Sequence, residues 1–298
     1  MTLSHELAAL GAAICWSITG LLSQPGAQAL GPFAFNRIRQ IMVVAMLAAI
    51  ITLTGRWGGV TAGDALVLAA SGVIGVFAGD TVLYFALLRL GPRRTGALFA
   101  MNAPIAALLG WLALGERLSP LAIAGIGLTT AGVMMAVLGR PGRSGSHRFE
   151  AVTGGIWGGI GFGLLAATGQ AVGSLIARPV MATGFDPYTA SLIRVGVAAL
   201  CLVGLTSLPL RAVRPRGRLT PRIALFTLLS GLVAMVMGMT LMMFALQGGK
   251  VGIVSTLSAL SPVLILPLLW GLTGARPSGT SWLGAVLAVA GMALIFTR

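Results

Sequence analysis

Long apolar stretches alternate with short polar segments along the whole chain. One of them, IMVVAMLAAIITL at 41–53, carries no charged residue. A helix needs about 20 mainly apolar residues to cross the hydrocarbon core of a bilayer, and the polar segments leave ten stretches of that size. We therefore expect ten transmembrane helices at 6–29, 33–54, 63–89, 93–114, 119–138, 151–177, 185–209, 221–247, 250–272 and 277–297.

Composition supports an all-α integral membrane protein. Hydrophobic residues make up 57% of the chain and charged residues 9%, against about 45–50% and about 25% in an ordinary soluble domain. A membrane β-barrel would instead show short segments of alternating hydrophobicity, and this pattern is absent. The ten helices use most of the chain, so no soluble domain is expected.

The sequence from residue 79 to 139 recurs, with changes, from residue 238 to the end. At a constant offset of 159 residues the matching pairs include Gly79 and Gly238, Thr81 and Thr240, Phe85 and Phe244, Trp111 and Trp270, Gly125 and Gly284, and Gly132 and Gly291. A match of this length indicates internal duplication. We divide the chain into a first repeat at 1–140, a polar linker at 141–150 and a second repeat at 151–298.

Each repeat contains five predicted helices, which is an odd number. The second repeat must then enter the membrane from the opposite side, so the repeats are inverted. Inverted repeats are a recurrent design of secondary transporters, in which the substrate binds near the middle of the membrane between the halves. We expect two inverted five-helix repeats around a central cavity.

The residues that give the net charge of +14 lie mainly in the loops and at helix ends. Arginines concentrate in one set of alternate loops, as the positive-inside rule describes for the cytoplasmic side of a membrane. The residues on this side are Arg37, Arg39, Arg89, Arg93, Arg94, Arg140, Arg143, Arg148, Arg211, Arg214, Arg216, Arg218, Arg222 and Arg276. This distribution favours both termini outside the cytoplasm, and it does not indicate nucleic-acid binding. The arginine-rich composition with a single lysine is compatible with a bacterial inner-membrane protein.

Several kinds of chemistry find no support in the sequence. Cys15 and Cys201 fall inside predicted helices, while His5 and His147 lie at the N-terminus and in the linker, so no metal cluster or histidine-assisted nucleophile is expected. No phosphate-binding loop occurs. The chain is predicted to be neither an enzyme nor a cofactor protein, with a small-molecule substrate and membrane lipid as partners and no ATPase subunit. The first apolar stretch lacks a basic leader and is interpreted as a retained helix.

Asp80 is the one acid well inside a predicted helix. A charge at that depth costs at least about 2.5–3.5 kcal/mol and usually has a function or a partner. Phe77 and Tyr84 lie one turn away on the same helix face, so Asp80 is expected to receive a substrate ammonium group or to exchange a proton. The alternative is a structural carboxyl group, because the second repeat has Met239 at the matching position.

Helix breakers and arginines also occur in pairs. Pro104 and Pro262 interrupt the fourth and ninth predicted helices, and paired interruptions indicate a transport site. Asn102 lies beside Pro104. Proline leaves a backbone carbonyl group without its helical hydrogen bond, and Asn102 and a ligand could both bind there. Arg37 and Arg194 stand at matching places near the starts of the second and seventh helices, where they either bind an anion or extend toward the membrane surface.

A substrate-binding set follows from the polar, aromatic and methionine residues inside the helices. Methionines repeat at helical spacing in the eighth helix, where they form either core packing or an adaptable pocket wall. No residue is predicted to be catalytic or to bind a metal. The predicted substrate-binding residues are Trp16, Phe77, Asp80, Tyr84, Asn102, Trp157, Gln170, Met239 and Ser258.

The segment FALLRLGPRRTGALFAMNAPIAALLGWLALGERLSPLAIAGIGLTTAGV, which contains Gly115-Glu116-Arg117, resembles the EamA-type ten-helix members of the drug/metabolite transporter superfamily. A weaker echo in the second half has Ala275 where Glu is usual. The resemblance covers the whole chain. It implies an exporter of small metabolites, with amino acids as the leading class. Another metabolite, such as a nucleobase, sugar or phosphorylated compound, stays open, whereas the sparse polar residues argue against a channel.

Overall fold

The computed structural model describes residues 3–138, 155–209, 213–261, 263–264 and 278–296, and all of its regular elements are helices. The first half contains α1 (Leu3–Leu30), α2 (Pro32–Thr54), α3 (Ala62–Ser71), η1 (Gly72–Ala78), α4 (Gly79–Phe99), α5 (Asn102–Leu114) and α6 (Pro120–Leu138). The second half contains α7 (Ile156–Ala182), α8 (Pro187–Ser207), α9 (Pro221–Gly231), η3 (Leu232–Met239), α10 (Thr240–Gly248), α11 (Val251–Ser258) and α13 (Gly279–Phe296).

These elements confirm the predicted all-helical membrane fold. Seven helical stretches are long and apolar enough to cross a membrane, and shorter apolar helices occur at Pro120–Ala136 and Gly279–Ile295. The ninth predicted span, at 250–272, begins with α11; its continuation at 265–272 lies outside the described residues, as does the linker predicted at 141–150. The sixth helix begins at Ile156 and not at the predicted residue 151.

The same local signals begin corresponding helices in the two halves. Thr61 and Thr220, which are 159 residues apart, both cap a helix by accepting a hydrogen bond from a backbone N–H group three residues later. Pro32 and Pro187 are the first residues of α2 and α8, where a missing N–H group costs nothing. The duplication therefore extends to the helix boundaries.

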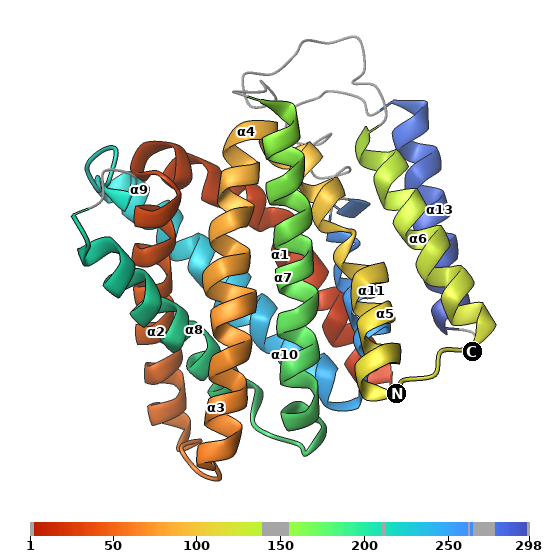
Figure 1. Ribbon diagram of the computed structural model, residues 1–298, viewed down its shortest axis with the longest axis horizontal. Coiled ribbons are helices and arrows are strands. Elements are labelled where there is room, and N and C mark those ends of the chain that lie inside the picture. The colour runs from red at the N-terminus through yellow and green to blue at the C-terminus, as the bar shows by residue number, and fades with distance from the viewer. Residues whose placement is uncertain (1–2, 139–154, 210–212, 262, 265–277, 297–298) are drawn as a thin grey trace.

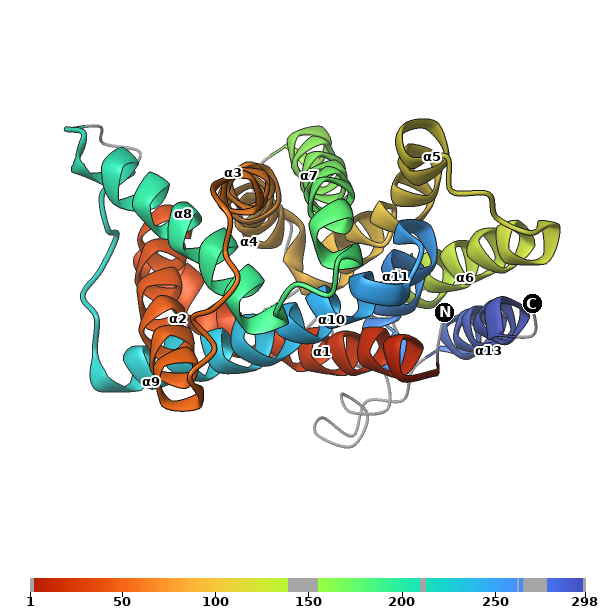
Figure 2. The same cartoon turned by 90° about the horizontal axis from the view of Figure 1, so that it is seen from below.

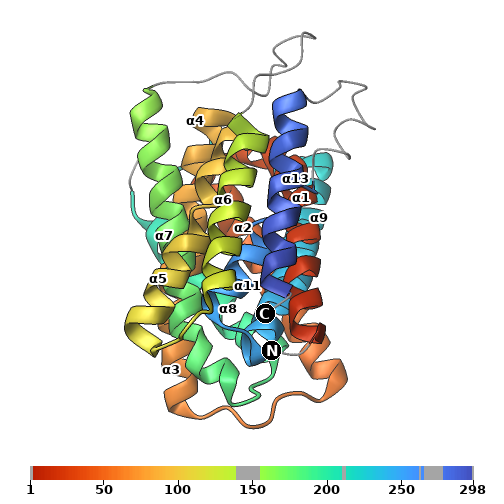
Figure 3. The same ribbon diagram turned by 90° about the vertical axis from the view of Figure 1, so that its right-hand side faces the viewer.

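Reciprocal glycine contacts between α6 and α13 reveal how the halves are related. A Cβ atom added to Gly125 would lie 2.7 Å from the carbonyl oxygen of Gly291, and one added to Gly132 would lie 2.7 Å from that of Gly284. Gly125 matches Gly284, and Gly132 matches Gly291, so each half presents the same two residues to the other. The earlier glycine of one helix meets the later glycine of its partner, and the helices are antiparallel, as expected for inverted repeats (Figures 1 and 3).

Matching helices also pair elsewhere in the molecule, with α2 packed against α8 and α5 against α11. Figures 1 and 2 place α2 and α8 at one end of the molecule and α6 and α13 at the other. The start of α1 and the end of α13 lie on the same side (Figures 1 and 3). An even number of crossings requires this arrangement.

Helical interruptions recur at corresponding places. The π-helical segment η1 ends two residues before Asp80, and η3 ends at Met239. Such segments frequently mark functional sites. A second break occurs at residues 100–101, before Pro104, and its counterpart at 259–260 comes before Pro262. Pro104 has no N–H group to donate to the carbonyl of Ala100, which explains the first break. Pro262 itself lies outside the described residues.

Candidate functional site

A buried ion pair joins α2 to α4 in the first half. Arg39 Nη2 lies 2.6 Å from Asp80 Oδ2, and the two side chains are 2% and 13% exposed. A buried charge pair is tolerated when hydrogen bonds complete its surroundings. Asp80, predicted from its depth in the helix, therefore has a protein partner and is not a free carboxylate.

The surroundings of Arg39 are polar and aromatic. Its guanidinium group lies over the rings of Tyr84 and Phe35, at 5.1 and 5.9 Å from the ring centres. Its Nη2 atom also donates to Asn36 Oδ1 at 3.3 Å, and Gln40 Nε2 approaches both Asn36 Oδ1 at 3.2 Å and Asp80 Oδ2 at 3.5 Å. These contacts fix the guanidinium group in one orientation.

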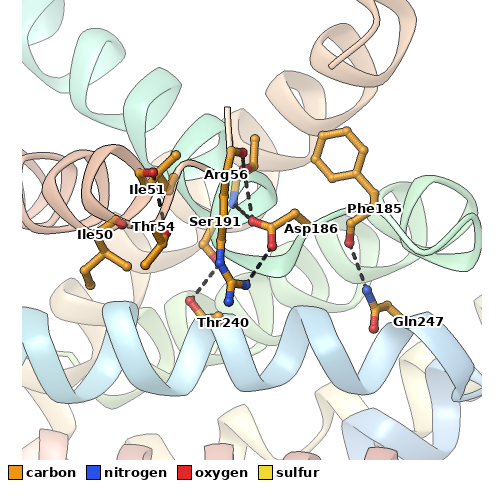
Figure 4. A network of polar contacts seen from close by, with 10 residues as sticks. Ile50, Ile51, Thr54, Arg56, Phe185, Asp186, Ser191, Thr240 and Gln247 are labelled. Carbon is orange, nitrogen blue, oxygen red and sulfur yellow. Dashed lines mark hydrogen bonds and ion pairs between the residues drawn. The ribbon is translucent and has the colours of Figure 1, made fainter. Parts of the chain in front are cut away.

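The corresponding position of the second half is built from thioethers. Arg194 is completely buried, and its Nη1 atom lies 3.1 Å from Met239 Sδ and 3.2 Å from Met243 Sδ. Met239 matches Asp80 and Met243 matches Tyr84 at the offset of 159. Beside them Thr240 Oγ1 donates to Ser191 Oγ at 3.3 Å (Figure 4), as Asn36 Nδ2 donates to Thr81 in the first half at 3.0 Å.

The structure corrects the arginine pairing expected from sequence. Arg39 follows Pro32 by seven residues, and Arg194 follows Pro187 by seven, so Arg39 and not Arg37 is the counterpart of Arg194. Arg37 Nη1 instead donates to Thr206 Oγ1 at 2.9 Å. Counting from the proline that begins each helix would have found the pair.

Glycines bring the two halves into close contact around these arginines. A Cβ atom added to Gly72 in η1 would lie 2.4 Å from the carbonyl oxygen of Arg194, and one added to Gly231 would lie 3.4 Å from Arg39 Cγ. Gly72 and Gly231 match at the offset of 159. Each arginine therefore packs against a glycine of the opposite half, while its guanidinium group makes its side-chain contacts with residues of its own half.

Two further predicted residues lie beside this centre. Trp16 Nε1 donates to the carbonyl of Ala234 in η3 at 3.0 Å, and it lies close to Gly238, directly before Met239. Gln170 is 5% exposed, and its backbone lies close to Gly79, directly before Asp80. The two residues occupy corresponding places in α1 and α7.

The remaining predicted residues are separate or differently engaged. Phe77 is partly buried against the main core. Asn102 Nδ2 donates to the carbonyl of Phe99 at 2.7 Å, and Ser258 Oγ donates to that of Ser255 at 3.1 Å, so both side chains satisfy local backbone. Trp157, the second residue of α7, is 81% exposed, and we leave it out of the proposed site.

Polar contacts between the halves gather on the side where α1 begins. Arg56 Nη1 lies 3.1 Å from Asp186 Oδ1 (Figure 4). Asp186 also caps α8 by accepting from the backbone N–H group of Thr189 at 2.8 Å. Lys250 Nζ donates to the carbonyl of Arg117. These contacts connect the first half to the second outside the helical core.

Glu116 makes the most extensive of these connections. Its Oε2 atom accepts from the backbone N–H group of Val251, the first residue of α11, at 2.9 Å, where the helix dipole favours a negative charge. Its Oε1 atom lies 3.7 Å from Arg178 Nε in α7. Burial raises the pKa of Glu116, while the Val251 hydrogen bond and the charges of Arg178 and Lys250 act in the opposite direction.

Within the described residues, no group of three or more His, Cys, Asp or Glu side chains forms a metal site. The two cysteines are free, with Cys15 buried and Cys201 partly buried. The buried centre therefore consists of charge pairs, hydroxyls and thioethers.

The model of the EamA-like transporter family matches residues 3–138 and 157–297. The chain belongs to the EamA-like transporter family. This membership confirms a multi-pass membrane transporter of the drug/metabolite superfamily that is not an enzyme, and transport implies a small-molecule substrate.

A solved crystal structure, titled only "Crystal structure of protein", has a TM-score of 0.77 and 21% identity, and the match covers 99% of this chain and 96% of that chain. At this identity the likeness shows the fold alone. No curated protein matches this chain in sequence. The substrate of this EamA-family transporter must therefore be argued from its own residues.

Proposed function

We propose that this EamA-family transporter exports small metabolites by alternating access, with neutral or aromatic amino acids as the leading substrate class. The observation that carries the proposal is the pair of corresponding arginines, Arg39 and Arg194, buried where the two inverted halves meet. Each lies seven residues, or about 10 Å, inside its helix. Inverted-repeat carriers bind their substrates at such a place.

Apolar and aromatic groups around the centre support an amino-acid substrate. Met239 and Met243 are buried beside Arg194, and methionine adapts to side chains of different shapes. Trp16 and Tyr84 supply aromatic surface near the same place. An amino-acid side chain would pack against these groups while its polar atoms meet the arginines.

Asp80 has a different role in this proposal from the one expected from sequence. Because Asp80 already pairs with Arg39 at 2.6 Å, a substrate ammonium group would have to displace a buried guanidinium group. We assign Asp80 to positioning Arg39 and place no ammonium group there. A phosphorylated metabolite is the second candidate, because guanidinium groups bind phosphate as well as carboxylate.

We propose that the protein lies in a bacterial inner membrane with both termini outside the cytoplasm. The arginine-rich loops support this orientation. The contacts of Glu116 and Arg56 then lie on the outer side and hold the halves together there. Release to the outside requires these contacts to separate.

Counterflow in proteoliposomes tests the proposed function. Liposomes that contain the purified protein are preloaded with one unlabelled amino acid, and entry of its labelled form is followed. Accumulation above protein-free liposomes for neutral or aromatic amino acids is expected. Accumulation of phosphorylated compounds alone would select the second candidate, and a flat response of folded protein to every amino acid would exclude the leading class.

A further inference from the structure

Arg194 has one edge of its guanidinium group without a hydrogen-bond partner among the described residues. The side chain is 0% exposed, and its Nε and Nη2 atoms are buried and make no hydrogen bond. Its Nη1 atom meets only the sulfur atoms of Met239 and Met243, which are weak acceptors. A buried donor without an acceptor is costly, so this edge requires an explanation.

The unpaired atoms have the geometry of an oxyanion-binding fork. Nε and Nη2 are the two nitrogens on one side of a guanidinium group, and their N–H bonds are parallel. A carboxylate group accepts both in a bidentate arrangement. The fork of Arg194 therefore matches the carboxylate group better than a neutral carbonyl or hydroxyl group, which would satisfy only one donor well.

Glycine at residue 75 lets η1 approach this fork closely. A Cβ atom there would lie 3.0 Å from Arg194 Nη2 and 3.2 Å from the Cα atom of Gly173. A side chain at residue 75 would therefore crowd both this donor and α7. Gly75 belongs to η1, the π-helical segment that leads to Asp80.

The balance of buried charge also favours an anion. Arg39 and Arg194 bring two positive charges into the centre, and Asp80 neutralises one through its ion pair with Arg39. The second half has Met239 where an acid would neutralise Arg194. An uncompensated charge inside a membrane protein is expensive, and one negative charge on a ligand would remove this imbalance.

We infer that Arg194 is the binding site for the carboxylate group of the transported substrate, held by Nε and Nη2. The inference rests on the proposed transport function and names the group that this transporter recognises. In the first half Asp80 supplies an internal carboxylate to Arg39 through Nη2 alone, and Arg39 Nε is buried without a hydrogen-bond partner. In the second half the substrate supplies the carboxylate, to both Nε and Nη2.

The test compares carboxylates with their amides. Counterflow of labelled L-phenylalanine, L-leucine and phenylacetate is measured, with L-phenylalaninamide, L-leucinamide and phenylacetamide as competitors. Thermal melting of purified protein with each compound, and with inorganic phosphate, reports binding independently of transport. In wild-type protein, carboxylates are expected to exchange and to raise the melting temperature, while the amides compete poorly.

Three variants test whether carboxylate binding depends on Arg194. Arg194→Gln should weaken carboxylate binding about 10–100-fold, as expected for loss of charge-assisted hydrogen bonds. Arg37→Gln also removes one arginine, but from a residue that bonds Thr206, and should keep wild-type binding. Met239→Asp gives Arg194 an internal carboxylate. It should abolish substrate binding while keeping or raising the melting temperature. This variant therefore tests the role of Arg194 even if Arg194→Gln does not fold.

The outcomes separate the inference from the proposed function. Counterflow of carboxylates that persists in Arg194→Gln or Met239→Asp would overturn the role of Arg194 and leave amino-acid transport intact. Melting shifts by carboxylates without any counterflow would support the site while excluding transport of these compounds. A shift with phosphate alone, or with no compound, would overturn the carboxylate assignment.

Discussion

Asp80 and Met239 occupy the same position in the two halves, and each contacts the arginine of its own half. Asp80 Oδ2 lies 2.6 Å from Arg39, and Met239 Sδ lies 3.1 Å from Arg194. The backbone around both residues is alike, since a π-helical segment occurs there in each half. One exchange of carboxylate for thioether therefore gives two structurally equivalent halves different electrostatic properties.

Loss of the carboxylate at Asp80 should destabilise the first half. In Asp80→Asn the guanidinium group of Arg39 stays buried without a counter-charge, and breaking a buried ion pair in this way costs about 3–5 kcal/mol. We expect a clearly lower melting temperature in detergent. Asp64→Asn, at a partly exposed acid in the first turn of α3, is the control and should melt near wild type. Equal melting of both variants would contradict the structural role of Asp80.

The contact between Glu116 and α11 should depend on pH. Burial raises the pKa of Glu116 above its ordinary value of 4.5, so the folded state binds a proton more tightly than the unfolded state. The stabilisation from this proton is complete below pH 4.5 and is lost as the pH rises through the raised pKa. Acid therefore favours the arrangement in which Glu116 is buried.

Melting of wild-type protein and Glu116→Gln across this range measures the effect. The variant keeps a carbonyl acceptor for Val251 but cannot titrate. We expect the melting temperature of wild-type protein, relative to the variant, to decrease as the pH rises from 4.5 toward neutrality. A constant difference, or one that increases, would show that the burial of Glu116 is not what controls its protonation.

The proposed orientation predicts which loops are accessible from outside the cell. Val60, in the exposed loop before α3, lies on the side where the chain begins, and Arg218 lies on the arginine-rich side. With Cys15 and Cys201 replaced by serine, Val60→Cys should react with a membrane-impermeant maleimide in intact cells, and Arg218→Cys only after lysis. The reverse pattern would place the termini in the cytoplasm.

Sequence periodicity and duplication were sufficient for the fold, because span length and helix boundaries depend on local composition. The predicted span at 33–54 coincides almost entirely with α2 (Pro32–Thr54). Asp80 was also found, since an acid inside an apolar helix is conspicuous. Its partner Arg39 was not, because the two residues are 41 positions apart and Arg37 lies beside Arg39 in sequence.

The π-helical segments had no compositional signal. GVIGVFA in η1 reads as ordinary apolar helix, and only tertiary packing of its glycines against α7 and α8 shows why the winding changes there. The exposure of Trp157 was equally hidden, because its composition and helical setting resemble those of buried aromatic residues. In each case the sequence did not show which face of one helix packs against its neighbour.

The reciprocal glycine contacts of α6 and α13 provide a test of the inverted packing. A Cβ atom at Gly132 would lie 2.4 Å from the backbone nitrogen of Ala288, whereas one at Gly127 would meet nothing within 4 Å. Gly132→Ala should therefore destabilise the protein by about 1–3 kcal/mol, and Gly127→Ala should be neutral or slightly stabilising because alanine favours helix. Melting of both variants measures this difference. Equal effects would mean that α6 and α13 do not meet through Gly132, and the inverted relation would then rest on the α2–α8 and α5–α11 pairs alone.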